Sequence, residues 1–337
     1  MDMIKEGKLQ KKDAGLAKKL ASLREITLIL IIAIFVVVMC FASEHFAKWS
    51  NIKVLLASLA TSGITTIGMT IVLISGGIDL SVGSVMCMAM AFAGTLITAG
   101  INPWIASVVG ILSAAVCGLV MGLLVTKLKL SHFIVTLCFM GIARGIVYAM
   151  TSGTSISLVA MLREIPQFAF IGQGYIGGIF PMTFTIFIII AVIAEIFARK
   201  SKLMRKVYYV GSNEQAAEHS GIKTDRVKIG ACVACSTLAG VAAIIFMTKF
   251  SGVNTSAGVG LEMTALSAAV IGGVSMNGGK GSVSGALLGL FLIVLVQNAM
   301  TLFSVPAFWQ DLIRYVIVLL AVILDVIQEN HKIKLNS

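Results

Sequence analysis

Long apolar runs, separated by short polar or glycine-rich segments, make up most of the chain. Residues 26–43 and 54–78 carry no charged side chain, and each run has the length of about 20 residues that an α-helix needs to cross a bilayer. The uncharged run over residues 80–126 is long enough for two such helices. The pattern therefore predicts an all-α membrane protein that crosses the bilayer many times.

The boundaries of the apolar runs predict about ten transmembrane helices. The eighth, residues 263–276, is too short to cross as a straight helix. We expect it to be a half-helix that ends in the glycine-rich sequence after it and still completes a crossing. The predicted spans are residues 26–43, 52–75, 80–99, 104–126, 131–150, 181–198, 229–247, 263–276, 283–303 and 311–328.

Composition and charge agree with this class and orient the chain. The 337 residues are 58% hydrophobic and 12% charged, with a mean hydropathy of +0.99, which excludes an ordinary water-soluble domain. The net charge of +11 comes from basic residues in the amino-terminal tail and between apolar runs. This distribution is typical of the positive-inside rule and does not indicate nucleic-acid binding.

The same rule predicts the domain boundaries. We expect residues 1–25 to form a basic cytoplasmic tail, residues 26–328 the transmembrane domain, and residues 329–337 a second cytoplasmic tail. Both termini are then cytoplasmic, and the first apolar run is a retained anchor and not a signal peptide. Within the transmembrane domain, residues 199–228 form a cytoplasmic loop, and residues 151–180 and 249–262 form outer segments.

Motifs for catalysis and metal binding are missing from the sequence. It contains no Walker A sequence, no H-E-x-x-H, no G-x-S-x-G and no cluster of His and Cys. Cys232 and Cys235 form a C-x-x-C, but no second pair accompanies them, and all six cysteines lie in or beside apolar runs, as packed small side chains do. We therefore expect no metal site, no cofactor and no ATPase site in this chain.

Two glycine-rich junctions, residues 75–84 and 271–285, interrupt the apolar runs on the predicted cytoplasmic side. Broken helices of this kind line the pathway in many transporters. The alternative is a tight turn in which Asp79 or Ser81 caps the next helix. The candidate junction residues are Gly76, Gly77, Asp79, Ser81, Gly272 and Gly273.

A few polar or aromatic side chains lie inside predicted spans. Arg144 is a functional candidate, although it could also snorkel or bind a backbone carbonyl. Phe139, Gln297 and Asn298 offer a stacking face and hydrogen bonds to a solute, with packing in the core as the alternative. Two pairs read as structural ion pairs at helical spacing, Glu195 with Arg199 and Asp311 with Arg314.

The basic loop contains a short helix signal. Asn213 can cap a helix through residues 214–220, and Gly221 can end it. A helix of small residues outside the bilayer fits a groove on a partner protein. The alternative is a connecting helix held near anionic lipid by its flanking Lys and Arg side chains.

Three segments together resemble a known family. Residues 75–84 resemble the G-G-I-D-L-S-V-G-S stretch of membrane permeases from sugar-type ATP-binding-cassette importers, the ribose, xylose, galactose and autoinducer-2 group. Residues 213–222 are similar to that group's form of the E-A-A…G coupling loop, except that His219 stands where an apolar residue is expected. Residues 269–285 and 308–310 look like its carboxy-terminal half, and the resemblance covers about residues 24–326.

The resemblance implies a permease subunit that forms the pathway of an ATP-driven importer for a monosaccharide or similar small polar solute. It implies a second permease copy or close paralogue, two cytoplasmic ATPase subunits that use the ATP, an extracytoplasmic solute-binding protein, and the bacterial inner membrane. The outer segments would receive the binding protein. The residues implied in coupling to the ATPase subunits are Asn213, Glu214, Ala216, Ala217 and Gly221.

The alternative function is a secondary transporter that needs no ATPase. Such a protein is expected to carry acidic side chains inside its spans for ion coupling, and Arg144 is the ionisable residue that lies clearly in mid-span. The sequence therefore favours the importer.

Overall fold

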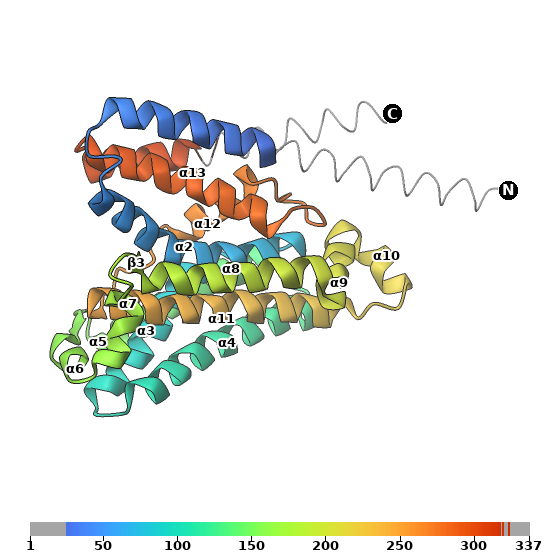
Figure 1. The fold of residues 1–337 in the computed structure, drawn as a ribbon. Coiled ribbons are helices and arrows are strands. Elements are labelled where there is room, and N and C mark those ends of the chain that lie inside the picture. Colours follow the sequence, from blue (N-terminus) through green and yellow to red (C-terminus); the bar gives the residue numbers. More distant parts are fainter. Residues whose placement is uncertain (1–24, 318, 320–322, 324–337) are drawn as a thin grey trace.

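The computed structural model describes residues 25–317 together with 319 and 323, and these residues are mainly helical (Figure 1). Seven helices in this part of the chain are long and apolar enough to cross a membrane, which confirms an all-α protein with many spans. They are Glu25–Ala42, α2 (Trp49–Ile74), α4 (Pro103–Lys127), α5 (His132–Thr151), α8 (Met182–Lys200), α11 (Thr224–Phe250) and α13 (Val283–Leu302).

Two further apolar helices are shorter, α3 (Val82–Thr98) and α12 (Leu261–Ile271). The half-helix expected near residue 263 is thus present as α12. Most of the predicted span 311–328, the predicted tail 329–337 and residues 1–24 lie outside the described residues. Because of these short and partly described helices, the number of ten crossings stays a prediction.

Short elements fill the connections. Helices α6 (Val159–Glu164) and α7 (Pro166–Gln173) lie in the predicted outer segment 151–180, and α9 (Lys202–Ser212) and α10 (Glu214–His219) lie in the basic loop. The antiparallel pairs are β1 (Ile156–Ser157) with β4 (Gly252–Val253), and β2 (Tyr175–Ile176) with β3 (Phe180–Pro181).

Helix α11 is central to the packing and contacts α2, α3, α4 and α7. Glycines allow the close approach of its neighbours: a Cβ at Gly68 of α2 would lie 2.9 Å from the Cα of Cys235, and one at Gly118 of α4 would lie 2.6 Å from the carbonyl oxygen of Cys232. Small residues at helix crossings are typical of membrane proteins. Cys87, Cys232 and Cys235 are buried, as the sequence predicted, but Cys40 and Cys138 are exposed on the outer faces of their helices, so the prediction of packed side chains is wrong for these two.

The bundle has two distinct ends (Figure 1). At the α10 end, α9 and α10 lie beside the start of α11, where the ammonium of Lys127 binds Asp225 at 2.7 Å. The first helix also begins at this end, since the Glu25 carboxylate accepts hydrogen bonds from the hydroxyls of Ser282 and Ser284. The opposite end, here called the α6 end, carries α6, α7 and the four strands.

Candidate functional site: a cavity between broken helices

A cavity of about 280 Å³ lies between α2, α11, α12, α13 and the last described helix, which begins at residue 307. The last turn of α11 and the first half of α2 line it, so it lies in the half of the bundle nearer the α6 end. Its volume suits a small polar molecule. The lining residues are Ser58, Thr61, Ser62, Met86, Phe246, Lys249, Phe250, Gly258, Val259, Gly260, Leu261, Thr264, Gln297 and Arg314.

Hydroxyl groups cover the α2 wall of the cavity. Thr61 and Ser62 lie three and four residues after Ser58, which places the three side chains on one face of the helix. Thr264 of α12 and Gln297 of α13 add polar groups from the other walls, and Phe246 and Phe250 add aromatic faces. The described lining residues include no carboxylate. Donors, hydroxyls and rings in this combination can bind an oxygen-rich neutral solute.

Residues 254–260, here called the unwound segment, form a further wall. After α11 ends at Phe250, the chain pairs in β4 and then returns along α3, with the carbonyl oxygen of Gly258 so close to Gly83 that a Cβ there would lie 2.1 Å away. The second half of the predicted outer segment 249–262 therefore lies among the helices. Irregular backbone at this depth requires partners for its polar groups.

Arg144 supplies those partners. Its Nη1 donates to the carbonyl oxygens of Thr255 at 2.6 Å and Ala257 at 3.0 Å. Cys87 of α3 places its Sγ 3.4 Å from the carbonyl oxygen of Asn254. Of the alternatives for Arg144, binding of backbone carbonyls is the one seen, and through these bonds it supports a wall of the cavity.

Of the other predicted pathway residues, one lines the cavity and two do not. Gln297 lines the cavity. Asn298 instead exchanges two amide hydrogen bonds with Asn51, at 2.7 and 3.0 Å, and joins α13 to α2. Phe139 packs against a small cluster of apolar side chains between α4 and α5. The sequence did not predict that Ser58, Thr61, Ser62 or Arg314 line a cavity. The helical spacing of the three hydroxyl residues is nevertheless visible in the sequence.

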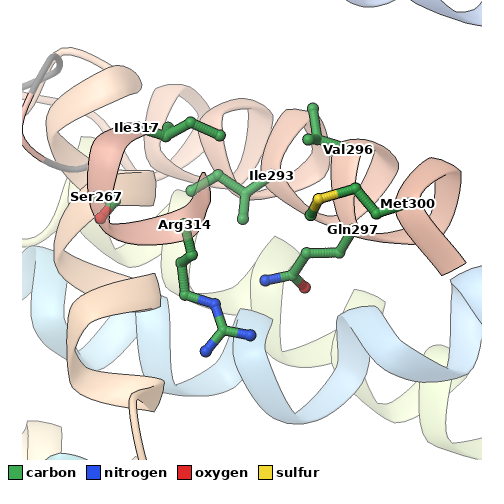
Figure 2. Close-up of a pocket in the computed structure, with 7 residues that line it drawn as sticks. All are labelled: Ser267, Ile293, Val296, Gln297, Met300, Arg314 and Ile317. Carbon is green, nitrogen blue, oxygen red and sulfur yellow. The ribbon is translucent and has the colours of Figure 1, made fainter. Parts of the chain in front are cut away.

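Arg314 forms the expected pair with Asp311, at 3.1 Å, and also reaches inward. Figure 2 shows its guanidinium and the Gln297 amide pointing into the space between the helices. A small chamber of about 10 Å³ lies there and is lined by Ser267, Ile293, Val296, Gln297, Met300, Arg314 and Ile317. Gln297 and Arg314 line both spaces and lie between them.

The two glycine junctions end helices in the same way. Gly76 (φ +87°) follows α2, and Gly77 N–H bonds to the Val72 carbonyl at 3.0 Å. Gly273 (φ +95°) follows α12 with the equivalent bonds. This left-handed helix end favours glycine. The six candidate junction residues, Gly76, Gly77, Asp79, Ser81, Gly272 and Gly273, are not among the described residues that line the cavity.

Asp79 and Ser81 form a local turn before α3. The Asp79 Oδ1 accepts from the Ser81 N–H at 2.8 Å and from its hydroxyl at 2.6 Å. Ser81 itself makes no capping hydrogen bond to α3. The local geometry of this junction is therefore the tight turn, in which the Asp79 carboxylate binds Ser81, the residue directly before α3.

Helix α9 connects both junctions. A Cβ at Gly211 would lie 1.8 Å from the Ile74 carbonyl oxygen and 2.7 Å from the Gly279 nitrogen, and Gly279 N–H itself donates to Ile74 at 2.9 Å. The Tyr208 hydroxyl donates to the Gly281 carbonyl at 2.9 Å. Burial raises the pKa of Tyr208 and the nearby Glu195 carboxylate raises it further, so the hydroxyl keeps the proton that this bond needs. The end of α2, helix α9 and the glycine-rich loop thus meet at one point.

Helix α10 has the caps that the sequence predicted. The Asn213 side chain accepts from Ala216 N–H at 2.9 Å, and Gly221 (φ +79°) ends the helix. Glu214 binds Lys228 of α11 at 2.6 Å, and Ala217 is buried against the bundle. Ala216, Glu218 and His219 are exposed. The helix is thus anchored on one side and presents its other side outward.

Comparison with known proteins places the chain in a family. The family model described as "branched-chain amino acid transport system / permease component" matches residues 51–322. The ribose import permease of Bacillus subtilis (strain 168) is 33% identical over 292 residues, 87% of this chain and 89% of the relative. The L-arabinose ABC transporter permease of Azospirillum brasilense is 34% identical over 282 residues (84% and 81%), and the autoinducer 2 import permease of Escherichia coli (strain K12 / DH10B) is 31% identical over 303 residues (90% and 86%). No solved structure matches the chain.

Proposed function

The chain belongs to the family of branched-chain amino acid transport system permease components, and on that premise we propose that it forms the membrane pathway of an ATP-driven importer for a monosaccharide or a similar small polar solute. The proposal is supported by similarity to permeases whose names give ribose, arabinose and autoinducer 2 as solutes. Membership of a family of importer permeases also favours it over the secondary-transporter alternative.

The side chains that line the large cavity favour a sugar over an amino acid as the solute. A zwitterionic amino acid brings an ammonium group, which a carboxylate stabilises and nearby cations repel. The described lining has Lys249 and Arg314 and no Asp or Glu. A sugar instead matches the hydroxyls of α2, the Gln297 amide and the rings of Phe246 and Phe250. A sugar is therefore the better fit, despite the description of the family.

The proposal includes an orientation. We assign the α10 end to the cytoplasm of a bacterial inner membrane, because most described Lys and Arg side chains lie there. These are Lys127, Lys129, Arg199, Lys200, Lys202, Arg205, Lys206, Lys223, Arg226, Lys228 and Lys280. The α6 end then faces outward, where a solute-binding protein would dock on residues 151–180.

One of two ATPase subunits would bind the exposed side of α10, and the other would bind the same helix of a second copy of the chain or a close paralogue, which completes the pathway. ATP is used by those partners, and this chain needs no cofactor of its own. Movement of α10 would pass to α9, and from Gly211 and Tyr208 to the end of α2 and the glycine-rich loop. Because α12 lies between that loop and the unwound segment, the same movement would reach the cavity wall.

Transport by the reconstituted complex tests the proposal. The permease, its ATPase subunits and its binding protein would be placed in proteoliposomes, and uptake of radiolabelled ribose, L-arabinose and leucine measured with and without internal ATP. We expect ATP-dependent uptake of a sugar and none of leucine. Uptake that needs an ion gradient and not ATP, or uptake of leucine alone, would overturn the proposal.

A further inference from the structure

Arg314 is a guanidinium with unused hydrogen-bonding capacity beside the large cavity. It comes from the last described helix, and its side chain is 22% exposed. Asp311 binds its Nη1. Its Nε is buried and finds no hydrogen-bond partner among the described residues. A buried donor without a partner costs free energy, so the arrangement is a reason to look for an acceptor that arrives from outside the chain.

The geometry of the guanidinium says what kind of acceptor fits. The group presents five donors in a fixed plane. With Nη1 occupied by Asp311, the remaining edge is formed by Nε and Nη2, whose N–H bonds are parallel and suit two neighbouring oxygens. In a sugar, the oxygens of two adjacent hydroxyls have this relation.

The surroundings of Arg314 favour a solute over a protein partner. Gln297 points into the same space (Figure 2), and Ser267 of α12 lines the small chamber beside it. Gly260 of the unwound segment approaches from the third side, where a Cβ would lie 3.2 Å from Nη1. Charged groups nearby are Lys249, which donates to the Ala57 carbonyl at 3.1 Å, and Glu262, which accepts from Gly260 N–H at 3.1 Å. Lys249 is hydrogen-bonded to the backbone of α2 and Glu262 is an acceptor, so Arg314 is the charged group in the described lining that has a buried donor without a partner.

We propose that Arg314 contacts the solute and determines its specificity, by donating from its Nε–Nη2 edge to two adjacent hydroxyl oxygens while Asp311 holds the guanidinium in position. This inference rests on the proposed function and narrows it to solutes with a vicinal diol. Arg314 already borders both the small chamber and the large cavity, so a small turn of the guanidinium that keeps its bond to Asp311 brings the edge to the solute. Gln297, which lines both spaces, supplies an amide for a third oxygen.

The test compares two sugars in the reconstituted complex. Ribose has adjacent hydroxyls at C2 and C3, and 2-deoxyribose lacks the first of them. ATP-driven uptake of each would be measured with the same binding protein at saturating sugar, for the native chain, Arg314→Gln and Arg314→Lys. The lysine variant keeps the charge and loses the planar edge. We expect the native preference for ribose to fall by about ten- to a hundredfold in both variants.

Two controls separate this role from a structural one. Leu312→Ala changes an exposed apolar side chain of the same helix and is expected to keep the native preference. ATPase activity stimulated by the binding protein is expected to persist in Arg314→Lys. A native complex that shows no ATP-dependent uptake of ribose, 2-deoxyribose or L-arabinose would overturn the proposed function and this inference with it. A native complex that prefers ribose, with the preference retained in both variants, would overturn the inference alone.

Discussion

At Gly211, the backbones of α9, the end of α2 and the glycine-rich loop come into close contact. Its hydrogen faces the carbonyl of Ile74, and any Cβ would overlap that oxygen. The contact leaves no flexible side chain to move aside, so Gly211→Ala forces the backbone of α2 or α9 to shift. Overpacking of this kind costs about 1–3 kcal/mol.

We therefore expect Gly211→Ala to lower ATP-driven uptake strongly while the complex still assembles. Uptake and the stimulation of ATPase activity by the binding protein would be measured together in proteoliposomes. Gly141→Ala is the matched control, because a Cβ at Gly141 meets nothing within 4 Å. Normal uptake by Gly211→Ala would show that this contact does not transmit the movement of α10.

Arg144 gives a second prediction at the scale of single residues. Arg144→Gln removes the charged donor that binds Thr255 and Ala257, and hydrogen bonds to charged groups contribute about 1.5–3 kcal/mol each. We expect a lower melting temperature for the purified permease. Arg163→Gln, which alters an exposed arginine of α6, is expected to change the melting temperature little. An unchanged melting temperature in Arg144→Gln would mean that the unwound segment is held by other contacts.

Neighbouring residues show what the sequence alone decides at this scale. Gln297 and Asn298 are both amides in one apolar helix, and the sequence treats them alike. Successive residues on an α-helix point about 100° apart, so one lines the cavity and the other pairs with Asn51. Only the packing of α13 against α2 makes that choice. Arg144 was likewise recognised as exceptional, but its partners are backbone carbonyls more than 100 residues away in the chain.

At the scale of elements, helices with local signals were predicted well. The cap residues Asn213 and Gly221 predicted α10, and the short apolar run after residue 262 predicted α12. The unwound segment was not predicted to lie among the helices. Five of its seven residues are Asn, Thr, Ser or Gly, which is typical of an exposed loop. Its position depends on the backbone contact of Gly258 with Gly83, which the local sequence does not indicate.

Helix α10 yields a prediction about coupling. In the double variant Glu214→Lys with Gly221→Asp, the ion pair with Lys228 becomes a repulsion, and Asp must adopt a left-handed backbone conformation. We expect uptake and ATPase stimulation to fall to background with normal assembly in the membrane. Unchanged uptake would refute the coupling role of this helix.

A charge exchange separates two roles of Glu214. The double variant Glu214→Lys with Lys228→Glu restores an ion pair of opposite direction between α10 and α11. Exposed and half-exposed ion pairs contribute about 0–1 kcal/mol, so assembly is expected to be normal in every variant. Recovery of uptake in the exchange variant would mean that Glu214 acts by anchoring α10. Continued loss would mean that its carboxylate contacts the ATPase subunit directly.

At the scale of the whole molecule, the resemblance found in short motifs is confirmed over most of the chain by the family model and the relatives. The structure adds a physical connection between three regions that carry the resemblance, because Ile74, Gly211 and Gly279, which lie in or just before them, meet at the α10 end. The large cavity lies toward the other end, with α12 and the unwound segment between them. Under the proposed function, α10 at one end would receive an ATPase partner and the cavity toward the other end a solute, and helices that are broken at glycine join the two.

This arrangement works as an importer only with the α10 end in the cytoplasm, and cysteine labelling tests that orientation. The exposed Cys40 and Cys138 would first be replaced by Ser. Ser155→Cys then places one thiol at the α6 end and Ser220→Cys one at the α10 end, both at exposed positions. Because basic loops are retained in the cytoplasm, a membrane-impermeant maleimide is expected to label Ser155→Cys in intact cells, and Ser220→Cys only after permeabilisation. The reverse pattern would place the basic surface outside, where no ATPase subunit could reach α10, and would exclude ATP-driven import through this helix.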